Sequence, residues 1–258
     1  LMPIINDYKK FEITDYGKGT VSKHHNMTKN EYCIPNTILS ADVFINVPKL
    51  KTHRKAGLSC AMKNLIGING DKRYIAHHRR GGERTGGDEY PEFNLGAWMK
   101  WHLWSTLKRY PSLLPFTRFI KKAYLGERSL REYSLESKDV MEGSWHGNDT
   151  IWRSIKDINK ILFYADKNGM MTSHIQRKYL CIVDGIVAGE GEGPMLGTPK
   201  QTGIIVGGSN PVAVDKVCAD VMGFDYNKIP TIKNGFSNKW WNLVDFQPDD
   251  IRTNTEIT

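Results

Sequence analysis

Basic residues and a histidine follow one short apolar run of this 258-residue chain at a spacing that suits anion binding. Residues 42–47 form the run and Pro48 ends it, so we expect a buried strand that delivers the next residues to a site. Lys49, Lys51 and His53 stand at alternate positions in the basic loop that we expect there. Lysines supply point charges for a phosphate or carboxylate, and histidine can exchange protons near neutral pH. The alternative is a solvated basic loop.

Lys63 lies in a different setting, among the small and apolar residues of a run at 58–66 that we expect to be helical. A cation in such surroundings needs a partner if it is buried. Lys63 is therefore a candidate catalytic residue together with His53, and the neighbouring Asn64 is a candidate substrate ligand.

A glycine-rich acidic turn is expected at 184–197, between two apolar runs near the C-terminus. Glycines such as Gly193 and Gly197 let backbone N–H groups approach a ligand closely. Asp184, at the end of a strand, is a common position for proton transfer or metal binding, and we pair it with Glu192 as a candidate divalent-metal site. The segment is neither a Walker A loop nor a G-x-G-x-x-G fingerprint, and a plain tight turn is the alternative.

A long charged loop at 67–90 contains His77 and His78 followed by Arg79. Adjacent histidines rarely bind one metal together, and the spacing matches no zinc template. We therefore assign His77 and Arg79 to substrate binding, with a simple loop as the alternative.

An aromatic and polar cluster occupies 145–153, at the start of a predicted helix. Asn148 and Asp149 are candidate substrate ligands that would close over the site. The alternative is that Trp152 is a core residue and Asp149 caps the helix.

The elements around these residues predict an α/β fold with a mostly parallel sheet flanked by helices. Apolar spacing predicts a helix at 151–165, and β-branched runs predict strands at 179–183 and 203–206. Asn210 and Pro211 open a helix that runs to residue 223 and carries Asp215, a fourth catalytic candidate. Ligands of such sheets bind at the carboxyl ends of strands.

The formal charge of +8 is unevenly distributed. Residues 46–84 carry a net +8 and residues 97–131 a net +7, so the remainder sums to −7. This pattern excludes a uniformly basic coat of the kind that histones carry, and no nucleic-acid-binding signature accompanies it. The hydrophobic fraction of 40% is enough for a sizeable core.

What the sequence lacks narrows the class of protein that we expect. It has no apolar window long enough for a spanning helix and no secretory signal pattern. The four cysteines are far apart, without a Cys-x-x-Cys motif, so we expect a cytoplasmic protein with no intrinsic iron–sulfur cluster. The thiols are expected to be small core residues.

Several motifs in order resemble the domain of unknown function 362 family. The matching segments are residues 42–53, 61–67, 183–186, 193–197, 209–215 and 222–224. The resemblance implies one α/β domain over 1–258 that lacks its N-terminal portion, with a loop and helical insertion at about 68–150. The segments at 77–79 and 145–153 are similar to a subgroup found near bacterial cell-surface polysaccharide genes. Some members are joined to iron–sulfur modules, which leaves a redox accessory role open.

These observations together predict an enzyme for an anionic, phosphorylated or carboxylated small molecule, with proton-transfer chemistry that a divalent metal could assist. The alternative is a non-catalytic accessory protein of polysaccharide assembly. Its Trp-rich basic segment at 97–131 would lie on the inner membrane surface, unless that segment packs on the body of the protein. The oligomeric state, the substrate and the reaction type are left open.

Overall fold

A computed structural model of the chain describes residues 8–14, 20–91, 142–237 and 240–255. The chain forms two compact units. The first contains residues 1–2, 32–72 and 151–258, and the second contains residues 3–31 and 73–150. Most of the stretch expected as an insertion thus belongs to the second unit, and the helices expected within 93–131 lie outside the described residues.

The first unit is an α/β structure built on a five-stranded mixed sheet. Its central strand β6 (Lys178–Glu192) pairs in parallel with β2 (Val43–Asn46) and β3 (Lys49–His53). Along its other edge β6 pairs with antiparallel β7 (Leu196–Gly208), while β4 (Gly57–Ser59) pairs antiparallel with β3. The α/β prediction is confirmed, but the sheet is mixed, because β4 and β7 each run antiparallel to a neighbour.

Two segments expected to be irregular are strands. Residues 49–53, expected as a basic loop, form β3, and most of the expected turn at 184–197 forms the ends of β6 and β7. Glycine predicts turns because it relaxes backbone sterics, but here the hydrogen-bond ladder between β6 and β7 holds the chain extended. Glycine also allows close strand approach, since a Cβ at Gly189 would lie 3.0 Å from the Lys51 Cβ.

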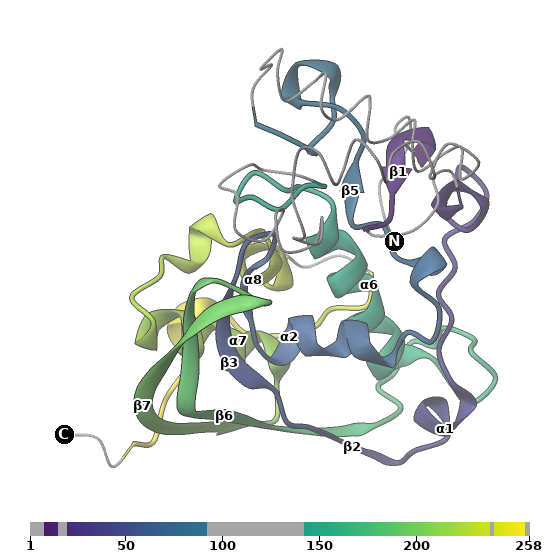
Figure 1. Cartoon of the computed structure of the whole chain (residues 1–258). Coiled ribbons are helices and arrows are strands. Elements are labelled where there is room, and N and C mark those ends of the chain that lie inside the picture. Colours follow the sequence, from purple (N-terminus) through teal and green to yellow (C-terminus); the bar gives the residue numbers. More distant parts are fainter. Residues whose placement is uncertain (1–7, 15–19, 92–141, 238–239, 256–258) are drawn as a thin grey trace, which may run out of the picture. The chain divides into compact units, whose positions relative to one another are not determined.

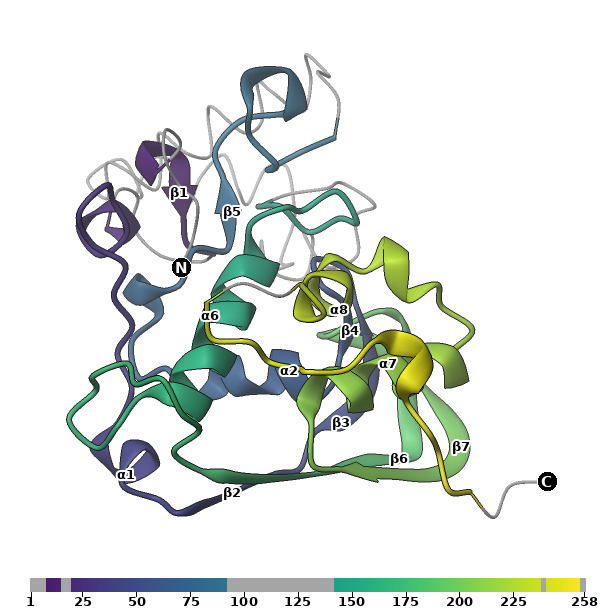
Figure 2. The ribbon, with the colours of Figure 1, turned by 180° about the vertical axis from the view of Figure 1, so that it is seen from behind.

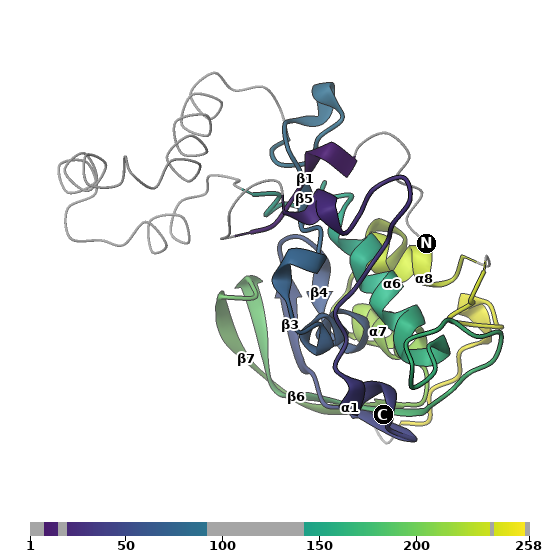
Figure 3. The same cartoon turned by 90° about the vertical axis from the view of Figure 1, so that its right-hand side faces the viewer.

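The β6–β7 hairpin is bent, as Figures 1 and 3 show. Its register shifts between Gly185 and Val187, and the pairing of β3 with β6 shifts between Lys49 and Lys51. Such irregularities bend strands and redirect side chains. As a result Lys49 stands opposite Asp184, whereas Lys51 stands opposite a residue five positions further along β6.

The helices of the first unit lie on one side of the sheet (Figures 1 and 2). Besides the short α1 (Asn36–Leu39) near β2, they are α2 (Ala61–Asn64), α6 (Ile151–Tyr164), α7 (Pro211–Val221) and α8 (Pro230–Gly235). The predicted helix at 151–165 is confirmed as α6, whose apolar side chains at 151, 155, 158 and 162 are buried as their spacing requires.

Helix α7 also forms as predicted. The Asn210 side chain accepts hydrogen bonds from the N–H groups of Val212 and Ala213, and Pro211 occupies the first turn. The helix expected at 58–66 is shorter, because β4 takes its first residues and a 3-10 turn at Leu65–Ile68 takes its last.

The opposite face of the sheet is apolar and exposed. Five aliphatic side chains share that face by register and are each between 40% and 63% exposed: Val43, Ile45, Leu180, Ile182 and Ile205. The described helices of this unit therefore flank the sheet on one face only. None of the helices in the described ranges is both long enough and apolar enough to span a bilayer.

The second unit contains a two-stranded antiparallel pair, β1 (Phe11–Glu12) with β5 (His78–Arg79). The other short elements in the described residues are α1 (Asn36–Leu39) and 3-10 turns at Tyr8–Lys10, Val21–Lys23, Lys72–Tyr74, Glu83–Thr85, Tyr226–Lys228 and Pro248–Asp250.

A buried arginine ties two helix ends to the sheet of the first unit. The Arg177 guanidinium donates to the carbonyl oxygens of Ile38 (3.1 Å), Leu162 (2.8 Å) and Ala165 (2.6 Å), and also to that of Leu39. Carbonyls in the last turn of a helix lack intrahelical partners, so Arg177 satisfies the ends of both α1 and α6.

We predict that Arg177→Met lowers the free energy of unfolding by about 3 kcal/mol, because buried carbonyls lose their donors. Urea denaturation followed by circular dichroism measures this change. Lys178→Met, at the exposed neighbouring position, is the matched control and should change the stability by less than about 0.5 kcal/mol. Equal stability of the two variants would contradict this role of Arg177.

Candidate functional site

The short helix α2, which carries Lys63, is anchored at its start by the carboxylate of Asp215. The N–H of Ala61 donates to Oδ1 at 2.6 Å and the N–H of Met62 donates to Oδ2 at 3.1 Å. Asp215 is 1% exposed, so its negative charge satisfies two helix-start N–H groups inside the protein. Burial raises the pKa of Asp215 to about 7, while hydrogen bonds from Cys60 and from the two N–H groups oppose the rise.

Two buried asparagines hold the rest of α2. Asn46 donates through Nδ2 to the Ala61 carbonyl and to the Tyr179 hydroxyl, both at 2.8 Å, and its Oδ1 accepts from Asn64 at 2.7 Å. Asn159 of α6 donates to the Met62 carbonyl at 3.1 Å. The predicted substrate ligand Asn64 thus has a structural partner, and α2 is fixed by hydrogen bonds from β2, α6 and α7.

Three of the predicted site residues, Lys51, His53 and Lys63, lie near one another, and we call them the cationic cluster. The three are close enough that the charges of Lys63 and Lys51 help to lower the pKa of His53. Neither lysine side chain has a hydrogen bond or an ion pair with any residue in the described part of the chain. A group of positive charges without a carboxylate is an electrostatic site for an anion.

The His53 ring is buried in one defined tautomer. Its Nδ1 accepts from the N–H groups of Lys55 (3.1 Å) and Ala56 (3.3 Å), so the proton of the neutral ring is on Nε2. Burial, followed by the charges of Lys63, Lys55 and Lys51, lowers the pKa of His53 to about 3. This environment favours a neutral hydrogen-bond donor, the role that a neutral histidine takes when it polarises a carbonyl, over a base that exchanges protons near neutral pH.

Lys63 is partly buried, and its environment disfavours the charged form. Burial is the main cause and the charge of Lys51 adds to it, so that the pKa of Lys63 is lowered to about 8. A lysine with such a pKa can both bind an anion and present a fraction of neutral amine.

The other residues predicted at this site lie in ion pairs. Lys49 Nζ lies 2.5 Å from Asp184 Oδ2 and both side chains are well exposed, which lowers the pKa of Asp184. Arg54 Nε lies 2.6 Å from Glu192 Oε2. Within the described ranges no three His, Cys, Asp or Glu side chains are placed to hold a metal ion. A metal on Asp184 and Glu192 stays a prediction.

Gly193 is required by packing of the chain on itself. A Cβ at this position would lie 2.0 Å from the Thr52 carbonyl oxygen, and the Gly193 carbonyl accepts from Arg54 N at 3.1 Å. The nearest atoms to a Cβ at Gly197 are 3.5 Å away, so that position is less constrained. Substrate contact by these two glycines stays a prediction.

Three cysteines that are far apart in sequence lie near Asp215. Cys60, Cys181 and Cys218 are fully buried and unpaired, which confirms that they are core residues, whereas Cys33 is exposed. A hydrogen bond with Cys218, together with burial, raises the pKa of Cys60, and burial raises that of Cys181 to about 12. Cys60 and Cys181 therefore stay protonated thiols, which are poor nucleophiles.

The remaining predicted residues belong to the second unit and support one another. The buried Asn148 side chain donates to the His77 carbonyl at 2.9 Å, and Arg79 pairs with Asp149 at 3.3 Å. The organising group is Asp88, whose carboxylate accepts from the N–H groups of Arg79 and Asp149 and from a threonine hydroxyl. That these residues close over a substrate stays a prediction.

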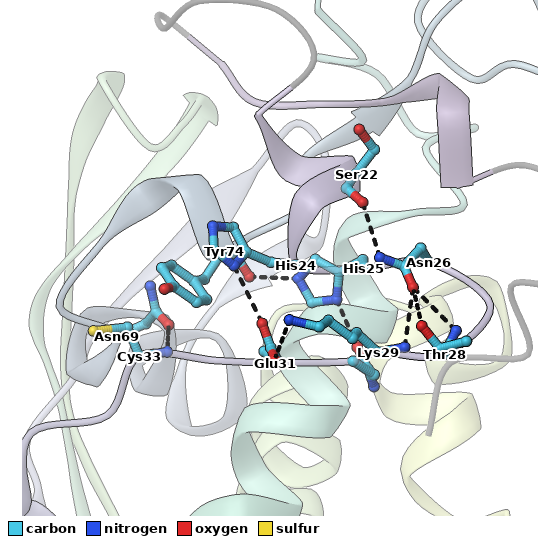
Figure 4. A network of polar contacts seen from close by, with 11 residues as sticks. Ser22, His24, His25, Asn26, Thr28, Lys29, Glu31, Cys33, Asn69 and Tyr74 are labelled. Carbon is cyan, nitrogen blue, oxygen red and sulfur yellow. Dashed lines mark hydrogen bonds and ion pairs between the residues drawn. The ribbon is translucent and has the colours of Figure 1, made fainter.

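A histidine network in the second unit was not anticipated from the sequence (Figure 4). His24 stacks on the Tyr74 ring at 3.6 Å and lies 3.3 Å from a Glu31 carboxylate oxygen. His25 is fully buried, with Nδ1 2.6 Å from Asn30 Oδ1 and Nε2 2.7 Å from the Tyr74 carbonyl. The adjacent histidines at 24 and 25 could have pointed to this network in the sequence. The network joins residues 24–31 to Tyr74.

Comparison with known proteins gives two matches. A family profile described as "Domain of unknown function (DUF362)" matches residues 5–220. A thylakoid-associated protein of Synechocystis sp. is 42% identical over 53 residues, which are 20% of this chain and 16% of that protein. The chain therefore covers less than a fifth of that relative's length. No solved structure matches the chain significantly.

Two buried titratable groups, Asp215 and His53, are expected to change the stability of the protein with pH in opposite directions. Asp215 has a folded-state pKa of about 7, raised from 3.8, so its contribution to stability is lost as pH rises through that range. His53 has a folded-state pKa of about 3, lowered from 6.5, so its contribution is lost as pH falls through that range.

We therefore expect the two contributions to oppose each other between about pH 4 and 6.5. Relative to the wild type, Asp215→Asn should make the unfolding free energy rise more steeply with pH over this window, by up to about 1.4 kcal/mol per pH unit. His53→Gln should change the slope by a similar amount in the opposite direction. Urea denaturation at several pH values measures both slopes. Identical slopes in the three proteins would refute the shifted pKa values of Asp215 and His53.

Proposed function

The chain belongs to the DUF362 family of domains of unknown function, and from this premise we propose that its first unit binds an anionic small molecule at the cationic cluster. The ligand class is a phosphorylated or carboxylated compound, and the activity is that of an enzyme. The observation that carries the proposal is the absence, among the described residues, of any acidic partner for Lys51 and Lys63.

Several other basic residues of the first unit, unlike Lys51 and Lys63, have acidic partners. Four of them have carboxylate partners within 2.7 Å: Lys49, Arg54, Lys200 and Lys216. The charges of these four cations are therefore balanced by carboxylates. The cationic cluster keeps two lysines and an N–H donor together without one, although their mutual repulsion costs stability.

A bound anion would relieve this repulsion. The lysines would each form a charge-assisted hydrogen bond, and His53 Nε2–H would add a neutral one, so that an oxyanion is met by three donors. Since an anion favours the charged form of Lys63, binding near pH 8 would also take up a fraction of a proton. The subgroup resemblance makes a sugar phosphate the first compound to test.

Peripheral membrane binding is a second candidate. The curated relative is named as thylakoid-associated, and residues 97–131 of this chain, which lie outside the described residues, carry eight basic residues and one acidic residue. A basic segment with interspersed tryptophans is typical of attraction to anionic lipid surfaces.

For the anion site, we predict that Lys51→Ala and Lys63→Ala each weaken binding of glucose 1-phosphate and inorganic phosphate by about tenfold or more, since a charge-assisted hydrogen bond contributes about 1.5–3 kcal/mol. Isothermal titration calorimetry measures the dissociation constants, and two buffers of different ionisation enthalpy report the proton uptake. Lys178→Ala, on the exposed apolar face of the sheet, is the matched control and should bind as the wild type does. Equal affinity in all four proteins, or no binding in any, would rule out the site.

For the membrane candidate, we predict that the full chain co-sediments with vesicles containing anionic lipid at low salt and is released at high salt, because screening removes the attraction. Neutral vesicles are the control. Failure to bind anionic vesicles even at low salt would remove this candidate and leave the anion site untouched.

A further inference from the structure

We propose that Lys63 is a nucleophile that forms an imine with the carbonyl group of a 2-oxo acid held in the cationic cluster. The proposal rests on the proposed function, since it takes the anion site as the place where the carboxylate of this substrate binds. It adds a reaction and a narrower ligand class to that site.

The position of Lys63 is the first support. Helix α2 has only four residues, yet Asp215, Asn46 and Asn159 hold it through buried hydrogen bonds. Anchoring of this kind fixes the backbone that carries a reactive group, which is the basis of catalytic positioning.

The state of the amine is the second support. An ammonium group has no lone pair, so an imine-forming lysine must be partly neutral near physiological pH. Burial and the nearby charge of Lys51 lower the pKa of Lys63 to about 8, which leaves about a tenth of the side chains neutral at pH 7. A nearby carboxylate would reverse this effect, and none of the described residues provides one.

The neighbours supply the two other functions that the reaction needs. Lys51 provides a positive charge for the substrate carboxylate, and His53 provides a neutral N–H donor for the carbonyl oxygen. Because both N–H groups that bond to His53 Nδ1 come from the backbone, the donor nitrogen is fixed as Nε2. A 2-oxo acid carries a carboxylate next to a carbonyl, which matches a cation and an N–H donor near an amine.

The step balances without an oxidant or a reductant. The lone pair of the neutral Lys63 amine attacks the carbonyl carbon, and the π electrons of the C=O bond move to the oxygen that His53 Nε2–H stabilises. A carbon–nitrogen double bond then forms and the carbon–oxygen bond breaks. The oxygen leaves as water, with the two protons that the amine nitrogen loses.

Reductive trapping tests the proposal on the full chain. The protein is incubated at pH 7.5 with pyruvate and sodium cyanoborohydride, which delivers hydride to an imine and converts it into a stable secondary amine. Intact mass and peptide mapping then locate the adduct. We expect Lys63 to be modified about tenfold faster than the exposed lysines, such as Lys178 and Lys200. Acetone, which has a carbonyl group but no carboxylate, should modify Lys63 at least about tenfold more slowly.

Variants and competition make the test specific. Lys63→Arg keeps the positive charge but cannot form an imine, so it should abolish the rapid phase, whereas Lys178→Arg should retain it. Should Lys63→Arg fail to fold, the wild type still decides the question, because phosphate that occupies the cluster must slow trapping at Lys63 but not at Lys178. Adducts spread evenly over the lysines, or a rapid phase that survives in Lys63→Arg, would overturn the proposal.

The two proposals fail in different ways. Phosphate binding at the cluster without preferential trapping of Lys63 overturns the imine and leaves the anion site in place. Absence of phosphate binding together with absence of trapping overturns both.

Discussion

The hydrogen bonds from the N–H groups of Ala61 and Met62 to the buried carboxylate of Asp215 determine where the candidate site lies. A carboxyl group that is 1% exposed is costly to ionise, and its pKa of about 7 reflects that cost. The two N–H groups offset part of the cost, because both would otherwise lack partners at the start of α2. Asp215 is thus a positioning residue in this structure: its carboxylate orients the turn that presents Lys63.

The electrostatics of the site follow from where carboxylates are placed. Asp215 is used by backbone N–H groups, Asp184 is used by Lys49, and Glu192 is used by Arg54. These pairings leave the cationic cluster without an internal counter-charge. Burial and, after it, the charges of neighbouring lysines therefore lower the pKa of both His53 and Lys63 unopposed. The acidic residues that the sequence suggested as proton-transfer or metal groups thus have other partners, and none of them pairs with a lysine of the cationic cluster.

The sequence predicted those elements that depend mainly on residues close together in the chain. The spacing of apolar residues predicted α6, and Asn210 with Pro211 predicted the start of α7, because periodicity and capping depend on neighbours in the sequence. The strand character of 184–192 was missed, since pairing with β7 outweighs the turn preference of glycine. The role of Asp215 could not be predicted, because it contacts residues more than 150 positions away. The structural role of Asn46 could have been anticipated, because it is a polar residue within an apolar run.

The bend between Lys49 and Lys51 explains why two lysines on one strand have different roles. A regular strand would place residues two apart on the same face, beside similar neighbours. Because the register with β6 shifts between them, Lys49 meets Asp184, whereas Lys51 stands opposite Gly189, which has no side chain to offer. Lys51 therefore keeps a charge that can bind an anion and disfavour a second charge on Lys63. Ligand binding and nucleophilicity need opposite protonation states of an amine, so the reaction that we propose uses two lysines, Lys51 for the carboxylate and Lys63 for the attack.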